Sequence, residues 1–335
     1  MIESSPRHSS GPSLNKLTRD TFVGPWAGLP VAWTDDNRFD EQTYRNDVRR
    51  CCQAGIPGVY SGGTSGEFYA MEFDEFKQVA RATVETCHEN GTPAMIGCTS
   101  TYTLGVARRI EVAATLGADA IQVALPFWME ISEQQIVPFF VDVAEAANGI
   151  PLSIYETTRA TRVLTLDQHR EIKSAIPSYL MVKSNAKTLG ATPEGCEALS
   201  EFVHVFVDES RWSELGPRGA CGSCSALVYW NPSVMLDMWE QLQSRNWPAL
   251  TIRAQQIAAL HKFLFDEFGP RGFTDTGYDR LGGVAGGFLS TNLRGRLPYP
   301  SANQEDVNVL RCWYAKNFPE MLNQADTPGS VRSTA

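Results

Sequence analysis

The chain lacks several features that would define its class at once. No apolar stretch approaches the roughly 20 residues that a membrane-spanning helix needs, and residues 1–16 contain no apolar segment of the kind found in secretory signals. No run is rich in Lys and Arg, and 38 acidic residues outnumber 29 basic ones, for a net charge of -9. Such a chain is poorly suited to follow a phosphate backbone. We therefore expect a cytoplasmic protein that binds neither membrane nor nucleic acid.

Patterns of cysteine and histidine that would indicate disulfides or a metal are also scarce. The eight cysteines are scattered through a long chain, which favours reduced thiols. Cys221-Gly-Ser-Cys224 has the spacing of a redox or metal pair, but no second C-x-x-C or paired-His motif accompanies it. The five histidines show no ligand spacing. We interpret this segment as a strand of small residues in a crowded barrel wall.

What the sequence does contain is a repeated alternation over residues 25–225. Short apolar runs alternate with longer segments of helical period, as expected when each parallel strand is followed by a crossover helix. Eight strands are predicted, at Trp26–Val31, Gly58–Ser61, Ala94–Cys98, Ala120–Ala124, Leu152–Tyr155, Leu180–Lys183, Val203–Val207 and Ala220–Ser225. An open doubly wound sheet would alternate similarly, but no G-x-G-x-x-G motif follows the first strand. The pattern therefore favours a closed (β/α)8 barrel, a TIM barrel.

The alternation stops after Ser225, which indicates where the barrel ends. Helices are predicted beyond it, near 233–245, 248–267, 273–287 and 304–321. The two ends of the chain are rich in Ser, Pro, Gly and Thr. Four regions are therefore predicted: a flexible tail at 1–16, the barrel at 17–230, a helical extension packed on the barrel at 231–324, and a second flexible tail at 325–335.

Reactive groups of a (β/α)8 enzyme lie at the carboxyl ends of its strands, and two unusual residues stand there. Lys183 ends the sixth predicted strand after three apolar residues, and Tyr155 ends the fifth. Apolar surroundings penalise a charged amine, so the neutral nucleophile becomes accessible. The tyrosine on the neighbouring strand can carry the protons that imine formation needs. A lone lysine would be interpreted as a side chain reaching for water; the pair predicts a nucleophilic lysine that forms an imine with a carbonyl group of the substrate.

The second predicted strand runs into a turn of small residues, Gly62-Gly63-Thr64-Ser65-Gly66-Glu67. Exposed N–H groups and hydroxyls in such a turn suit a carboxylate. Thr64 and Glu67 also have the spacing of a helix capping box, which would explain the pair by a structural role alone. The residues themselves leave both interpretations open.

These features together resemble the dihydrodipicolinate synthase/N-acetylneuraminate lyase family over roughly residues 22–240. The hallmarks that match are the turn at 63–67, Tyr155, Lys183, and a G-x-x-G-x-x-S segment at 219–225. The resemblance implies that Lys183 forms an imine, that Tyr155 shuttles protons, and that Thr64 with Ser65 holds the substrate carboxylate. It also brings Gly63 and Ser225 to the substrate site. The resemblance further implies a homotetramer or homodimer that needs no metal or organic cofactor.

Three departures from the family pattern point away from dihydrodipicolinate synthesis. The usual T-P-F near the end of strand one is here Val31-Ala32-Trp33, and the Asn-x-Pro after the strand-five tyrosine is Glu156-Thr157-Thr158. Synthases carry a relay tyrosine after strand four, where this chain reads Leu125-Pro126-Phe127-Trp128. A proton relay through that position is lost.

Two classes of substrate stay open. The segment ending at Trp128 resembles hydratase-aldolases that cleave aromatic benzylidenepyruvates, and its aromatic side chains would form apolar walls. Asp208 and Glu209 stand where sialic-acid lyases hold sugar hydroxyls, and with Glu156 they would accept hydrogen bonds from a polyhydroxylated substrate. Arg159 has a guanidinium suited to a second substrate carboxylate.

Three functions are consistent with these residues. The leading prediction is a lyase that cleaves or forms a carbon–carbon bond between pyruvate and an aldehyde. The second is a dehydratase of a 2-keto-3-deoxy sugar acid, which begins with the same imine. The third is a ligand-binding barrel without turnover, which the substitutions at Trp33, Trp128 and Glu156 suggest.

Overall fold

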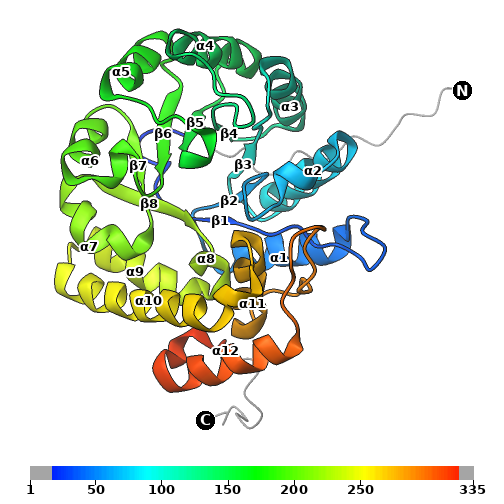
Figure 1. Cartoon of the computed structure of the whole chain (residues 1–335). Coiled ribbons are helices and arrows are strands. Elements are labelled where there is room, and N and C mark those ends of the chain that lie inside the picture. Colours follow the sequence, from blue (N-terminus) through cyan, green and yellow to red (C-terminus); the bar gives the residue numbers. More distant parts are fainter. Residues whose placement is uncertain (1–16, 324–335) are drawn as a thin grey trace, which may run out of the picture.

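The computed structural model describes residues 17–323 and contains eight parallel strands that close into a barrel in chain order (Figure 1). The strands are β1 Gly24–Gly28, β2 Gly58–Ser61, β3 Ala94–Gly97, β4 Ala120–Val123, β5 Leu152–Glu156, β6 Tyr179–Ser184, β7 His204–Phe206 and β8 Ala220–Ser225. The predicted (β/α)8 architecture is confirmed. β1 ends earlier than predicted, before Pro30, which has no amide hydrogen to continue a ladder.

Helices on the outside of the barrel cover the strands (Figure 1). They are α1 Glu41–Gln53, α2 Phe73–Glu89, α3 Thr103–Leu116, α4 Ile136–Ala147, α5 Leu166–Ala175, α6 Pro193–Ser200, and the short α7 Trp212–Leu215 and α8 Leu227–Trp230. The predicted apolar face of α4 is buried, including Ile136, Phe140 and Val143. Each such face covers one part of the barrel wall.

Four longer helices follow the barrel: α9 Pro232–Gln243, α10 Trp247–Phe268, α11 Asp275–Gly286 and α12 Gln304–Asn317. α9 and α10 each carry a proline in the first turn, where no amide hydrogen is required. α10 packs on α7, and α11 packs between α8 and α12. The tails predicted at 1–16 and 325–335 lie outside the described residues. No helix between residues 17 and 323 is long and apolar enough to cross a membrane.

Large side chains fill the inside of the barrel below its carboxyl ends. The rings of Phe22 and Trp26 lie 4.9 Å apart, and both are fully buried. Gly58 makes room for Trp26, because a Cβ at this position would lie 2.5 Å from its indole. Met181 joins the same cluster and lies one strand period before Lys183, on the same face of β6. The barrel is thus packed beneath the predicted lysine.

Candidate active site

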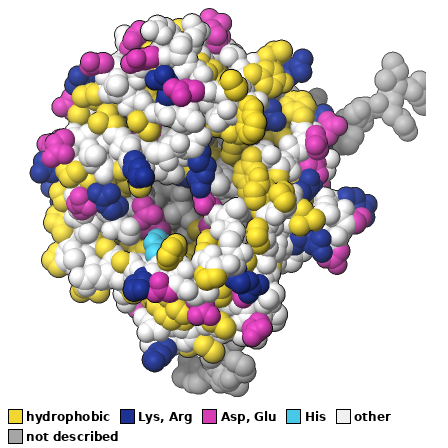
Figure 2. Space-filling view, in the orientation of Figure 1, with side chains coloured by type: hydrophobic (Ala, Val, Ile, Leu, Met, Phe, Trp, Pro, Cys, Tyr) yellow, Lys and Arg dark blue, Asp and Glu magenta, His cyan; other side chains and the backbone are white. Residues whose placement is uncertain are grey.

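A cavity of about 900 Å³ opens at the carboxyl ends of the strands. Figure 2 shows it as a hollow in the middle of this face, with acidic and basic side chains at its edge. The predicted site residues that line it are Thr64, Ser65, Tyr155, Arg159, Lys183, Asp208, Glu209 and Ser225. Gly63, Trp128 and Glu156 do not line it.

Lys183 and Tyr155 are direct neighbours across two parallel strands. The β5–β6 register pairs the two residues, so their side chains leave the sheet on the same face. Lys183 Nζ lies 4.4 Å from the centroid of the Tyr155 ring and 5.8 Å from that of Tyr60. The amine therefore lies against two aromatic faces at the inner end of the cavity.

The Tyr155 hydroxyl lies in a polar environment although the residue is buried. Asn185 Nδ2 donates a hydrogen bond to this hydroxyl at 3.1 Å. Burial alone would raise the pKa of Tyr155, but the charge of Lys183 and polar contacts from Thr64 and Asn185 outweigh it, so the pKa is lowered. A phenol of lowered pKa beside an amine is suited to moving a proton.

The turn after β2 brings Thr64 and Ser65 into the cavity but not Gly63. Gly63 packs below the turn, since a Cβ at this position would lie 2.3 Å from the Tyr60 hydroxyl oxygen. The capping box considered for Thr64 and Glu67 does not form. Glu67 has a left-handed backbone (φ +53°) and precedes a short 3-10 helix, Phe68–Ala70.

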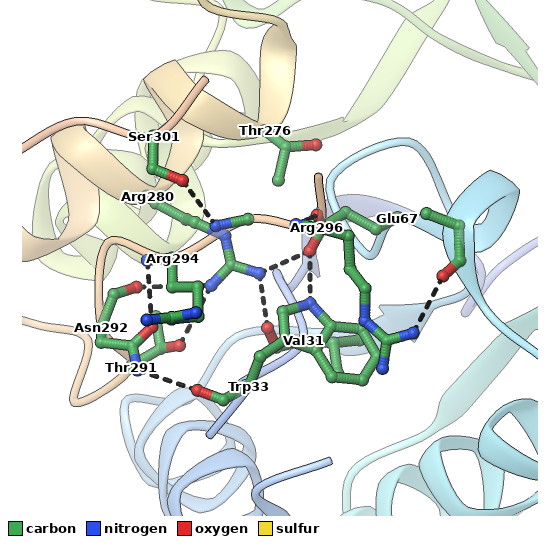
Figure 3. Close-up of polar contacts among 12 residues, drawn as sticks. Val31, Trp33, Glu67, Thr276, Arg280, Thr291, Asn292, Arg294, Arg296 and Ser301 are labelled. Carbon is green, nitrogen blue, oxygen red and sulfur yellow. Dashed lines mark hydrogen bonds and ion pairs between the residues drawn. The ribbon is translucent and has the colours of Figure 1, made fainter. Parts of the chain in front are cut away.

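Glu67 instead turns inward and is held by buried donors from distant parts of the chain (Figure 3). Its Oε2 accepts hydrogen bonds from Trp33 Nε1 and Arg280 Nη2, each at 2.6 Å, and its Oε1 accepts one from Arg296 N at 2.7 Å. The guanidinium carbon of Arg296 lies 3.9 Å from the Trp33 ring centroid. Trp33, one of the departures from the family pattern, is therefore a buried partner of Glu67 and does not line the cavity.

Two buried carboxyl groups face the lysine across the cavity. Burial raises the pKa of Glu209 to about 8, with a further rise from Asp208 and partial relief from Ser225 and Lys183. Asp208 itself caps the short helix that follows it, accepting a hydrogen bond from Ser210 N at 3.0 Å. Glu209 Oε2 has no hydrogen-bond partner within the described chain.

The second carboxyl group, Asp279 on α11, was not predicted from the sequence. Its side chain is 8% exposed, lines the cavity, and faces the hydroxyls of Ser65 and Tyr229. Burial raises its pKa to about 7, Asp275 adds to the rise, and Ser65, Tyr229 and Lys183 oppose it. The only signal in the sequence is an acidic residue next to Arg280 on a glycine-rich helix.

Three predicted residues have surroundings that differ from the expectation. Glu156 is 2% exposed on the outer face of β5, where it accepts a hydrogen bond from Leu164 N at 2.9 Å and lies 3.4 Å from His169. Trp128 is 81% exposed outside the cavity. Arg159 lines the cavity but already pairs with Asp275, with Nη2 at 2.9 Å from a carboxylate oxygen.

Fold and site together define a (β/α)8 enzyme with a lysine and a tyrosine side by side at the carboxyl ends of its strands. The chain belongs to the dihydrodipicolinate synthetase family, whose model matches residues 22–286. Membership of this family places it among the lyases.

Relatives and solved structures agree with this assignment. A 4-hydroxy-tetrahydrodipicolinate synthase of Methanothrix thermoacetophila is 25% identical over 292 residues, which cover 87% of this chain and 95% of the relative. An uncharacterized DapA-like lyase of Pyrococcus abyssi is 25% identical over 222 residues, 65% of this chain and 74% of the relative. YagE of E. coli K12, solved in complex with pyruvate, has a TM-score of 0.79 at 17% identity and covers 88% of this chain and 98% of its own. The structural likeness shows the shared fold.

Proposed function

We propose that the protein is a class I lyase in which Lys183 forms a Schiff base with a 2-oxo acid. The observation that carries this proposal is the amine 4.4 Å from the Tyr155 ring centroid, at the packed inner end of a cavity lined by Thr64 and Ser65. Such a site places a proton carrier directly beside a half-buried amine. The chemistry draws on these side chains and needs no organic cofactor or metal.

The reaction balances with the groups present. The neutral amine attacks the keto carbon, and the oxygen leaves as water after Tyr155 delivers a proton. The resulting iminium accepts the electron pair of the bond between the third and fourth carbons when the hydroxyl on the fourth carbon gives its proton to the Tyr155 phenolate, which releases an aldehyde. The enamine that remains takes up a proton, and water then hydrolyses the imine to free pyruvate and Lys183. The reverse order joins pyruvate to the aldehyde.

The substrate that fits this cavity best carries several hydroxyl groups. Asp208, Glu209 and Ser225 line the cavity with the lysine and can all accept hydrogen bonds. Trp128, expected as an apolar wall for an aromatic aldehyde, lies outside the cavity. We therefore favour a 2-keto-3-deoxy sugar acid over an arylidene pyruvate.

Dehydration of the same class of acid is a second candidate, and the state of Glu209 favours it. A carboxyl with a pKa near 8 is protonated at neutral pH and can donate its proton to a departing hydroxyl. The two outcomes differ in their products. Released pyruvate indicates the aldolase, and a dicarbonyl product without loss of carbon indicates the dehydratase.

Trapping with borohydride tests the imine directly. Incubation with pyruvate and borohydride should add one reduced pyruvyl group, and peptide mapping should locate it at Lys183. Lys183→Ala should lose the adduct, whereas Lys187→Ala, the matched control on the same segment, should keep it. An unmodified wild-type protein would refute the proposal. An adduct with no product from any 2-keto-3-deoxy acid or arylidene pyruvate would instead support the ligand-binding barrel.

We also propose that the protein assembles as a homotetramer or homodimer. Trp128 and Met129 are 81% and 72% exposed on the segment after β4, and Tyr102 and Leu104 are 54% and 55% exposed at the start of α3. Large apolar side chains gathered on two neighbouring segments are typical of an interface between subunits. Sedimentation of the full chain tests this.

A further inference from the structure

Three residues of helix α11 lie against the turn after β2. Thr276 Oγ1 donates a hydrogen bond to Thr64 O at 3.1 Å, and Arg280 Nη2 donates one to Glu67 Oε2 at 2.6 Å. Between them on the same helix face, Asp279 lines the cavity together with Ser65, whose hydroxyl lowers the pKa of its carboxyl group. Helix α11 thus holds the turn through the contact between Arg280 and Glu67 (Figure 3) and also brings an acidic group to the middle of the turn.

The position of Asp279 creates an electrostatic conflict. Under the proposed function, Thr64 and Ser65 hold the carboxylate of the 2-oxo acid, so a second negative charge beside Ser65 would repel it. The nearest positive charge on α11, Arg280, is already paired with Glu67. Asp275, one turn earlier, pairs with Arg159 at 2.9 Å but still raises the pKa of Asp279, whereas Lys183 on β6 opposes that rise. The Tyr229 hydroxyl from α8 is buried and without a hydrogen-bond partner within the described chain.

We propose that Asp279 controls occupancy of the carboxylate site: a 2-oxo acid binds the form in which this carboxyl group is neutral, so binding takes up one proton. The neutral carboxyl group of Asp279 donates a hydrogen bond to the substrate carboxylate, whereas the ionised form would repel it. The inference rests on the proposed function and adds a specificity-determining residue to it. Burial gives Asp279 a pKa of about 7, so both forms are populated near neutral pH.

The test compares pyruvate binding by wild type and Asp279→Asn across pH, with methyl pyruvate as a ligand that has no negative charge. The ratio of the wild-type to the variant dissociation constant for pyruvate should rise about thirtyfold from about pH 6 to about pH 8.5, as a pKa of about 7 requires. The same ratio for methyl pyruvate should stay flat. Methyl pyruvate also forms an imine with Lys183. A pH-dependent change in the lysine itself would therefore alter the dissociation constant of both ligands.

Two further measurements test whether the pH dependence belongs to Asp279. Glu209→Gln, which removes the other buried carboxyl group of raised pKa, should retain the pH dependence. Proton uptake by wild type alone, measured by calorimetry in buffers of different ionisation enthalpy, should exceed that for methyl pyruvate by close to one proton at about pH 8. Equal proton uptake for the two ligands, or the same pH dependence in Asp279→Asn, would overturn the inference while the lysine adduct still forms. Absence of any adduct in wild type would overturn the proposed function and this inference with it.

Discussion

Replacing Arg280 by methionine should destabilise the fold far more than an ordinary loss of an ion pair. Both Arg280 and Glu67 are buried, at 0% and 1% side-chain exposure, with 2.6 Å between Nη2 and Oε2. The substitution leaves Glu67 with a buried charge and only Trp33 Nε1 and Arg296 N as donors. Breaking a buried pair in this way costs about 3–5 kcal/mol. At about 2–4 °C per kcal/mol for a domain approaching this size, the melting temperature should fall by about 6–20 °C.

A pair on the surface provides the matched control. Arg218 Nη1 lies at the same 2.6 Å from Glu197 Oε2, but the two side chains are 50% and 59% exposed. Arg218→Met should therefore change the free energy of unfolding by less than about 1 kcal/mol. Denaturant unfolding of both variants and of Glu67→Gln/Arg280→Met measures the difference. The double variant should recover part of the stability, because no charge stays unpaired. Equal losses in Arg280→Met and Arg218→Met would refute the reasoning.

Three further predictions concern the site and its surroundings. Tyr155→Phe should keep the pyruvate adduct but slow product formation by about 10²- to 10⁴-fold, measured under single-turnover conditions, because the proton carrier is lost; an unchanged rate would exclude this role. Glu209→Gln should raise the free energy of unfolding at about pH 9 and have little effect near pH 5. The folded pKa of Glu209 is raised to about 8, so its stabilising protonation is complete at low pH and is lost as pH rises through that value; thermal unfolding at the two pH values measures this, and equal effects would contradict it. Trp128→Ser should shift the sedimentation coefficient toward the monomer if this exposed side chain lies between subunits; an unchanged coefficient would remove it from the interface.

Local patterns in the sequence carried enough information for the barrel and for the pairing of two side chains. Lys183 and Tyr155 each end an apolar run, and parallel register alone brings the ends of adjacent strands together. Glu156 shows where such reasoning fails by one residue. β5 continues through Glu156, and alternation along the strand turns its side chain toward His169 on the outside of the barrel.

The contacts of α11 could not be predicted in the same way. Asp279 and Arg280 meet Ser65 and Glu67 only because the C-terminal helices pack against α8 and the turn after β2. Nothing in the periodicity of a helix specifies which distant segment covers it. The left-handed backbone of Glu67 adds to the difficulty, since it replaces a familiar capping pattern with a side chain directed inward.

The packed floor of the barrel has a consequence for the order of events during turnover. Phe22 and Trp26 fill the barrel beneath Lys183 and close the inner end of the cavity. If the keto carbon of the substrate is attached to Lys183 at the inner end, the part of the substrate that becomes the aldehyde lies between the lysine and the opening of the cavity. Under the proposed function, cleavage would release that fragment first and pyruvate second, and synthesis would load pyruvate before its partner. The packed inner end of the barrel would thus set the order in which the two products leave.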